Sequence, residues 1–240
     1  MRMTEIDKKI LARFMRFCAA NNNTEDLELA LRLGADPNLS DKNGYNALHV
    51  AAFSGSDQTI ELLNEFGGNI NACDRFGKTP LQFSALSAKL NTTKKLLDLG
   101  ANPNLGDLNG FCPLHIAAQH NNKDIVSLLI QNNADTDKKD KYGQSALHWA
   151  AFYGNKEIVE LLIQAKADIN LANNNGQTPL VYALKAKNMS VVKLLKSAGA
   201  KDLAPTKARK SPMDYVVQKQ EKNLKTILKA EHVNQLKKAR

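Results

Sequence analysis

The chain has 240 residues and a formal net charge of +9; 43% of the residues are hydrophobic and 24% are charged. This composition supplies a substantial core and excludes a globally disordered chain. No apolar stretch approaches the roughly 20 residues of a membrane span, and the first residues lack the apolar region of a secretory signal peptide, so we expect a soluble protein that makes no use of a membrane.

Cysteine content indicates the cellular compartment, and the charge distribution shows where the basic residues lie. The three cysteines are widely spaced and form no CxxC pair, which excludes a disulfide framework and a cysteine-based zinc site and favours the reducing cytoplasm. Residues 201–240 hold 11 of the 33 Lys and Arg residues but only 4 of the 24 Asp and Glu residues. The basic charge therefore belongs to the C-terminal segment and not to the whole protein.

The N-terminal segment predicts a long first helix. Thr4 stands three residues before Asp7, which is the spacing of a capping box. The segment TEIDKKILARFMRFCAANN carries charges on one side. A charged outer side is what the first unit of a stacked array requires.

From residue 44 onward the chain repeats with a period of 33 residues. Five glycines mark the period without insertion or deletion: Gly44, Gly77, Gly110, Gly143 and Gly176. The segments that begin at these glycines are GYNALHVAA, GKTPLQFSA, GFCPLHIAA, GQSALHWAA and GQTPLVYAL. A second apolar segment follows in each period, for example VELLIQAKADIN.

Each period predicts two short helices. Leu147 and Ala150 lie at helical spacing in the first, and Ile158 and Leu162 form the stripe of the second. Gly154 between them can take the positive φ that ends the first helix. Neither helix can bury its apolar side alone, so the units must stack on one another. Helix starts are marked by Thr79, Ser145 and Thr178 as caps, and by Pro80, Pro113 and Pro179 in the first turn.

These segments resemble ankyrin repeats, whose 33-residue period and T-P-L-H-x-A signature they match in strict register. The resemblance covers about residues 11–228 and implies an all-α ankyrin-repeat solenoid of helix-turn-helix units with β-turn tips. We expect about seven repeats, including caps at both ends. The expected domains are an N-terminal capping repeat at 1–43, five repeats at 44–76, 77–109, 110–142, 143–175 and 176–208, and a C-terminal capping repeat with a basic amphipathic helix at 209–240.

Four residues depart from the ankyrin pattern. Gln82 stands where His is usual. Ala88, Lys166 and Lys187 occupy positions where the family favours Gly or Asn in the left-handed conformation, at a cost of about 1 kcal/mol each. We expect the third and sixth repeats to be looser than the others.

The recurring polar residues have structural explanations. Three histidines fill the same signature position, where the family's histidine ties one repeat's turn to the next: His49, His115 and His148. Four aspartates precede the repeat glycines by three residues, where Asp caps a turn: Asp41, Asp74, Asp107 and Asp140. The chain has no P-loop, no GxSxG and no dinucleotide-binding glycine motif. We therefore expect no catalytic residue, no metal site and no cofactor.

Asn71 and Asn170 lie in the loop after the second helix of their repeats. Each has Ile one residue before it and Leu eight residues before it. This resembles the setting in which asparaginyl hydroxylase modifies ankyrin repeats, so both are candidate hydroxylation sites. The alternative is a structural amide that bonds across the loop.

The ankyrin resemblance also implies where a partner docks, namely on the turn tips and the exposed side of the first helices. These positions hold seven Phe and Tyr residues and several Lys and Arg residues but no acidic residue, a composition typical of a binding hot spot. For Phe53 and Phe152, packing against neighbouring repeats is an equally open alternative. The candidate partner-binding residues are Tyr45, Phe53, Arg75, Phe76, Lys78, Phe111, His120, Lys141, Tyr142, Phe152 and Tyr153.

We therefore expect a monomeric, non-catalytic protein–protein interaction module that binds a protein partner on its concave, aromatic-rich face. Two alternatives stay open. The basic C-terminal segment, including Lys207, Arg209 and Lys210, could bind nucleic acid or phosphate, although lysines on the polar side of a capping helix are ordinarily solvated. The Asn- and Lys-rich composition is also compatible with a bacterial effector that is delivered into a host cell and acts on a host protein.

Overall fold

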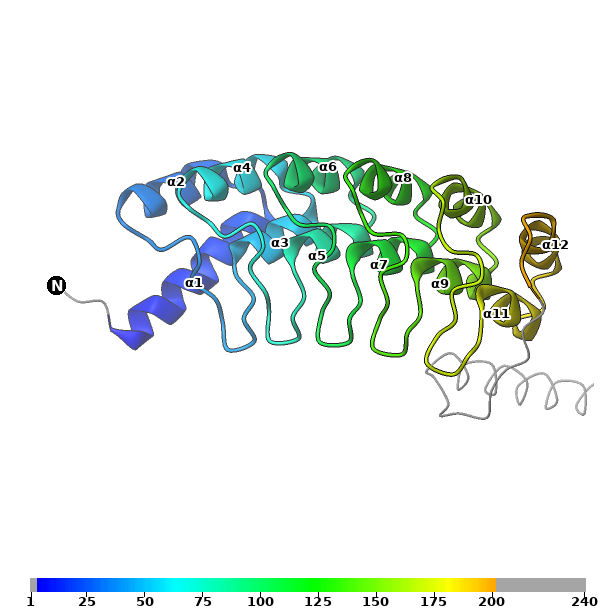
Figure 1. The fold of residues 1–240 in the computed structure, drawn as a ribbon. Helices are drawn as coiled ribbons and strands as arrows, with labels where there is room; N and C mark the ends of the chain where they lie inside the picture. Colours follow the sequence, from blue (N-terminus) through cyan, green and yellow to red (C-terminus); the bar gives the residue numbers. More distant parts are fainter. Residues whose placement is uncertain (1–3, 202–240) are drawn as a thin grey trace, which may run out of the picture.

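The computed structural model describes residues 4–201, which form six helix pairs stacked in one direction (Figure 1). The first helices of the pairs are α1 (Glu5–Ala20), α3 (Ala47–Ser54), α5 (Pro80–Leu86), α7 (Pro113–Gln119), α9 (Ala146–Tyr153) and α11 (Pro179–Lys185). The second helices are α2 (Thr24–Arg32), α4 (Asp57–Glu65), α6 (Leu90–Asp98), α8 (Lys123–Gln131), α10 (Lys156–Gln164) and α12 (Met189–Ser197).

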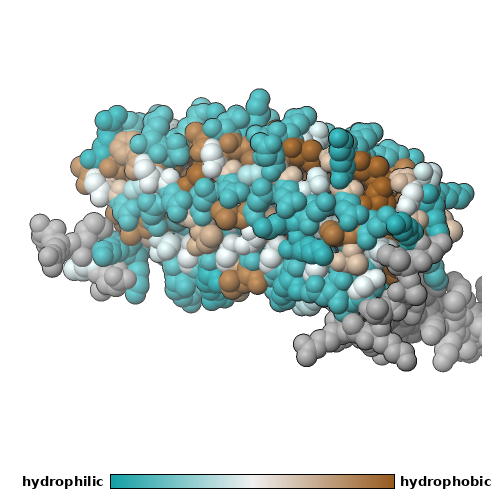
Figure 2. Space-filling view, viewed as in Figure 1, coloured by the Kyte–Doolittle hydropathy of each residue, from teal (hydrophilic) through white to brown (hydrophobic). Residues whose placement is uncertain are grey.

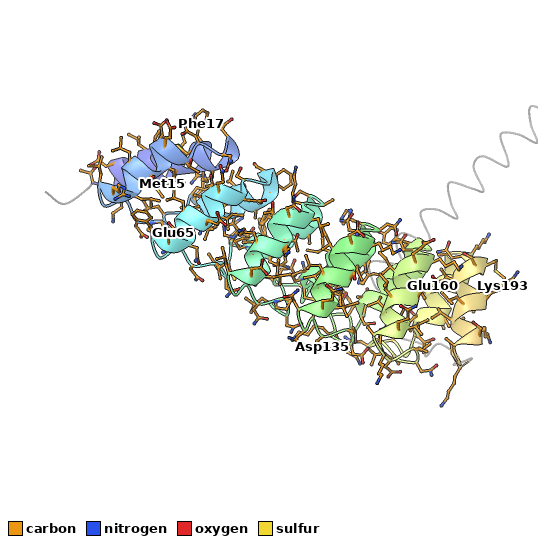
Figure 3. All side chains as sticks on the ribbon, turned by 90° about the horizontal axis from the view of Figure 1, so that it is seen from above. Met15, Phe17, Glu65, Asp135, Glu160 and Lys193 are labelled. Atoms are coloured by element: carbon orange, nitrogen blue, oxygen red, sulfur yellow. The ribbon has the colours of Figure 1, made fainter. Side chains whose placement is uncertain are left out.

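The helices lie in two layers. The first helices form an inner layer and the second helices an outer layer, and the outer layer runs along the convex side of the curved stack (Figure 1). Seen from above, the outer helices follow one another side by side along the whole length (Figure 3). The loops that precede the inner helices project away from the outer layer. We call these loops the fingers, and they are residues 41–45, 74–78, 107–111, 140–144 and 173–177.

Local sequence explains where the inner helices begin. Thr79 caps α5: its side chain accepts a hydrogen bond from the Gln82 N–H, and Pro80 follows at the first helical position. The N-cap of α9 is Ser145 and that of α11 is Thr178, as the sequence predicted. The Thr79 side chain thereby satisfies a backbone donor that has no partner within the helix, whereas the Thr178 hydroxyl makes no hydrogen bond within the described residues.

Each finger is a tight turn that is bonded to the next finger. In the finger 74–78, the Asp74 N–H donates to the Lys78 carbonyl over 2.9 Å, and Asp74 Oδ1 accepts the N–H groups of Phe76 and Lys78 over 2.8 Å. The Leu108 N–H then donates to the Phe76 carbonyl over 2.9 Å. Equivalent backbone bonds join each of the other described fingers to its neighbour. The fingers therefore form one connected edge, and the repeated Asp is a turn residue, as expected.

One continuous apolar core runs between the layers from the first helix pair to the last. Its most regular members are leucines that recur with the 33-residue period and are completely or almost completely buried: Leu48, Leu81, Leu114, Leu147 and Leu180. Alanines next to them in the inner helices allow the helices to approach closely. This confirms the predicted all-α solenoid for the described residues.

A side chain of each of four inner helices bonds to the finger of the following repeat. His148 Nε2 lies 3.0 Å from the Gln177 carbonyl. In the same way, His49 Nε2 and His115 Nε2 lie 3.0 Å from the carbonyls of Lys78 and Gln144, each in the finger of the following repeat. Gln82 substitutes for the histidine, since its Nε2 donates to the Phe111 carbonyl over 2.5 Å. The departure at Gln82 therefore keeps the bond that joins the third repeat to the fourth.

The predicted left-handed positions are confirmed: Ala88, Lys166 and Lys187 have φ of 56°, 64° and 61°. The predicted C-terminal capping repeat at 209–240 lies outside the described residues, as do Lys207, Arg209 and Lys210 of the basic segment, so both stay predictions. Within residues 4–201, no helix has the length and apolar character needed to cross a membrane.

Candidate functional site

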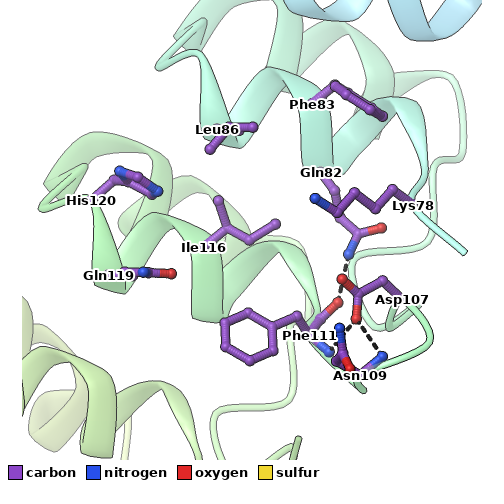
Figure 4. Close-up of a pocket in the computed structure, with 10 residues that line it drawn as sticks. All are labelled: Lys78, Gln82, Phe83, Leu86, Asp107, Asn109, Phe111, Ile116, Gln119 and His120. Atoms are coloured by element: carbon purple, nitrogen blue, oxygen red, sulfur yellow. Dashed lines mark hydrogen bonds between the residues drawn. The ribbon is translucent and has the colours of Figure 1, made fainter. Parts of the chain in front are cut away.

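A groove opens between the third and fourth repeats on the inner face, which we define as the surface of the inner helices and fingers (Figure 4). Its volume is about 240 Å³. Apolar side chains of α5 and α7 line its middle, namely Phe83, Leu86 and Ile116. Polar residues surround them: Lys78, Gln82, Asp107, Asn109, Gln119 and His120, with Phe111 at the finger end. We call this the central groove.

The fingers determine which groups the central groove offers. Asp107 Oδ1 accepts the N–H groups of Asn109 and Phe111 over 2.8 and 3.1 Å, so one oxygen of this carboxylate is engaged by its own turn (Figure 4). Lys78 is half-buried, and no ion pair is formed by it among the described residues. The groove therefore offers an apolar floor, amide and imidazole groups, one cation and one carboxylate.

An aromatic cluster borders the central groove on the side of the second repeat. The Tyr45 ring packs edge-on against Phe83, with ring centres 5.5 Å apart, and Phe83 packs edge-on against His49 at 5.6 Å. Tyr45 is half-buried in this cluster. The Tyr45 ring is therefore part of the packed surface of the inner face and not an exposed side chain at a finger tip.

A second aromatic cluster borders the groove on the side of the fifth repeat. Phe111 packs against Trp149 with ring centres 4.8 Å apart, and Tyr153 stacks on the same indole at 6.3 Å and an angle of 14°. Phe152 lies between Tyr153 and Tyr182 and is only 4% exposed. The exposed member of this cluster is Tyr153, whose hydroxyl accepts a hydrogen bond from Gln119 at the groove.

Two expectations need correction here. Phe152 is part of the core, because Trp149 and Tyr182 enclose it, and it cannot contact a partner without rearrangement. Phe111 is not a freely exposed tip residue, because its ring is half-buried against Trp149 and His115. Phe53, by contrast, is 51% exposed, so the packing alternative does not hold for it.

The finger tips carry cations beside aromatic rings. The Arg75 guanidinium lies 4.5 Å from the centre of the Phe76 ring, and the Lys141 ammonium lies 5.2 Å from that of Tyr142. Phe76 is exposed, and so is Leu108 at the tip of the next finger. Figure 2 shows this view of the surface as mostly hydrophilic, with hydrophobic residues in separate patches that include one at the finger tips. A cation over an aromatic face is held in place while its charge stays accessible.

The signature histidines are buried structural groups. Burial lowers the pKa of His49 and His115, and it lowers the pKa of His148 to about 4. Their ring nitrogens are used by backbone groups of their own repeat and of the next finger. Among the described residues, no group of three His, Cys, Asp or Glu side chains comes together in a way that could hold a metal ion.

The loop asparagines also act as structural clamps. Asn71 Oδ1 accepts the Asn102 N–H over 2.8 Å, and its amide donates to the Gly100 carbonyl over 3.4 Å. Asn170 Oδ1 accepts the Lys201 N–H over 2.8 Å. Each joins one repeat to the next, which supports the structural alternative at both positions.

Comparison with protein families identifies this architecture of stacked helix pairs. A model described as "Ankyrin repeats (3 copies)" matches residues 15–107 and 85–173, and a model described as "Ankyrin repeat" matches residues 175–207. The chain belongs to the ankyrin repeat family. No curated protein gives a significant match. Ankyrin repeats are generally protein–protein interaction modules and are typically non-catalytic.

Sequence analysis missed two residues that build the centre of the site. Phe83 and Ile116 are absent from the candidate partner-binding residues, yet both line the central groove. They are 33 residues apart, in the register that also holds Trp149 and Tyr182. A large apolar residue at this position in consecutive repeats was the available signal.

Proposed function

We propose that this ankyrin repeat chain binds an extended segment of a protein partner across its inner face, with the central groove as the anchoring site. The observation that carries the proposal is the groove itself: an apolar floor of Phe83, Leu86 and Ile116 between two aromatic clusters. Its volume of about 240 Å³ is below the roughly 300–1,000 Å³ of drug-sized ligand sites. A site of this size suits an anchoring side chain better than a cofactor.

The charges around the groove favour a partner with carboxylates near its apolar anchor. Arg75 and Lys141 lie on the tips of the two fingers on either side of the finger 107–111, and Lys78 lies at the edge of the groove. Backbone N–H groups hold one oxygen of each finger aspartate in its own turn without removing the carboxylate charge, so the attraction for such a partner comes from the cations at the finger tips alone. Complementary charges of this kind add specificity and speed association more than they add affinity.

The experiment is a selection of binding peptides from a random library, followed by affinity measurements on variants of the full chain. Leu86→Glu places a charge on the apolar floor and should weaken binding of the selected peptide by at least about tenfold. Leu90→Glu is the matched control, because Leu90 is similarly exposed but begins the outer helix α6. Equal effects of the two substitutions, or no effect of Leu86→Glu on a folded protein, would contradict the proposal.

The alternative in which the basic C-terminal segment binds nucleic acid rests on residues outside the described part of the chain. Salt dependence separates the two proposals, because phosphate binding weakens steeply as salt rises whereas an apolar anchor does not. Delivery into a host cell as a bacterial effector rests on composition alone.

A further inference from the structure

The central groove alone is too small to hold a partner specifically. Its volume of about 240 Å³ suits one anchoring side chain. A standard protein interface buries about 800 Å² on each partner, so a bound segment must also contact the inner face beyond the groove. The surface on the two sides of the groove therefore decides where the segment continues.

Toward the N-terminal end of the stack, the apolar floor of the groove continues for one more repeat. Leu86 and Gln119 hold the same repeat position on α5 and α7 and line the groove (Figure 4). Phe53 holds this position on α3 and is 51% exposed. Val50 and Phe83 share a second repeat position on α3 and α5, and both are half-buried against the core. Phe53 and Val50 thus extend the apolar surface of Leu86 and Phe83.

Toward the C-terminal end, the same position offers no apolar surface. Phe152 follows Gln119 in the register but is only 4% exposed, and the next residue in the register is Lys185. Tyr153 is exposed on this side, but its hydroxyl accepts a hydrogen bond from Gln119. A segment anchored in the central groove therefore finds its second apolar contact on α3.

The distance between the two contacts limits the conformation of the segment. Leu86 and Phe53 lie on adjacent inner helices that contact each other, and such helices pack about 8–10 Å apart. In a polyproline II helix, residues i and i+3 point the same way about 9 Å apart. In an α-helix, residues i and i+7 do so about 10.5 Å apart. Side chains on one side of a β-strand lie about 7 or 13 Å apart, which does not match.

The polar rim of the groove favours polyproline II over the α-helix. A polyproline II segment makes no internal hydrogen bonds, so its backbone carbonyls need donors from the partner surface, whereas an α-helix satisfies its own. The rim offers the amides of Asn109 and Gln119 and the imidazole of His120. Aromatic-lined grooves are also the usual docking surface for polyproline II segments, and aromatic clusters border this groove on both sides.

Resting on the proposed partner binding at the central groove, we propose that the bound segment adopts the polyproline II conformation. One apolar side chain occupies the groove, and a second, three residues away in the segment, packs on Phe53. The partner class is a proline-containing segment with apolar residues at i and i+3. Proline suits the positions between them, because its fixed φ matches this conformation and its missing N–H costs no internal hydrogen bond.

The first test measures the affinity of a library-selected peptide for variants of the full chain. Phe53→Glu should weaken binding about fivefold or more. Leu29→Glu is the matched control, because Leu29 is 59% exposed but lies on the outer helix α2, and it should leave the affinity unchanged. If Leu86→Glu weakens binding and Phe53→Glu does not, the second contact is wrong while binding in the groove stands. If neither does so on a folded protein, the proposed function itself fails.

The second test varies the selected peptide. Alanine scanning should find two dominant apolar positions three residues apart, and Phe53→Ala in the protein should remove the contribution of only one of them. Proline at either position between them should keep the affinity within about twofold or raise it, because it fixes the bound conformation beforehand. Dominant positions at another spacing, or a loss of more than about tenfold on proline substitution, overturn the polyproline II conformation.

Discussion

Glycine is required at position 77 for two separate reasons, the backbone conformation and the close approach of the next finger. Its φ is +78°, and a Cβ there would lie 2.9 Å from the backbone nitrogen of Leu108 in the next finger. Gly100 has a similar φ of +86° but nothing within 4 Å of such a Cβ. The two glycines therefore separate the cost of the left-handed conformation from the cost of the close approach.

We expect Gly100→Ala to lower the free energy of unfolding by about 1 kcal/mol, which is the cost of the left-handed conformation alone. Gly77→Ala should cost clearly more, about 2 kcal/mol or above, because the finger must also move away from Leu108. Urea unfolding of both variants measures the difference. Equal costs would show that adjacent fingers do not need their close contact.

The buried His148 side chain should make the folded protein less stable in acid. Its Nδ1 accepts the Ser145 N–H and its Nε2 donates to the Gln177 carbonyl, so the folded protein holds the neutral ring. Burial lowers its pKa from 6.5 to about 4, with His115 and Lys139 acting in the same direction and Asp168 against it. Between these two pH values the unfolded chain binds a proton that the folded chain does not.

Stability should therefore fall as the pH decreases from about 6.5 to 4, by on the order of 3 kcal/mol from His148 when the change is complete. The lowered pKa values of His49 and His115 act in the same direction. His148→Gln is the informative variant, because Gln82 already makes both equivalent bonds in the third repeat. Urea unfolding at several pH values should show a shallower slope for this variant, and an unchanged slope would exclude His148 as the source.

At the scale of the helix, the residue that follows α5 has a conformational cost that the equivalent residues after α3 and α9 avoid. Ala88 follows the last turn of α5 with φ of 56°, whereas Gly55 and Gly154 hold the equivalent positions after α3 and α9. A Cβ in the left-handed conformation costs about 1 kcal/mol or more. Ala88→Gly should therefore stabilise the protein by several tenths of a kcal/mol to about 1 kcal/mol, after the greater freedom of glycine in the unfolded chain is subtracted.

The thermal midpoint and the urea midpoint of Ala88→Gly both measure this gain. Ala85→Gly is the control, since Ala85 is buried inside the same helix and its replacement should destabilise. A destabilised Ala88→Gly protein would mean that the methyl group packs favourably enough to offset its conformation.

Elements of this fold could be predicted from sequence because each unit contacts only its neighbours. The same local requirements therefore recur every 33 residues. The glycine of the finger, the Thr or Ser cap and the buried leucine can each be recognised from the local sequence. Even the departures followed local chemistry: Gln82 can accept and donate at the same two places as histidine.

Side-chain directions on the inner face could not be predicted in the same way, because they depend on the residue that the next repeat offers. Phe111 turns toward the large surface of Trp149, and Phe152 is enclosed by Trp149 and Tyr182. Phe53 finds no ring partner among the described residues and stays exposed. Phe111 is consequently a poor probe of binding, because its replacement would also remove packing between repeats.

At the scale of the whole molecule, the stack brings the inner helices and fingers of successive repeats onto one surface, the inner face (Figure 1). The inner face combines an apolar groove with cations at the tips of the fingers 74–78 and 140–144.

Hydrogen–deuterium exchange of the full chain, with and without a selected peptide, tests the central claim most directly. Binding in the central groove should slow exchange in residues 74–87 and 107–120, which hold the two fingers and inner helices that line it. The outer helices α6 and α8 of the same two repeats should exchange unchanged, and they serve as the internal control. Protection confined to α6 and α8, with none in the two fingers, would contradict partner binding on the inner face.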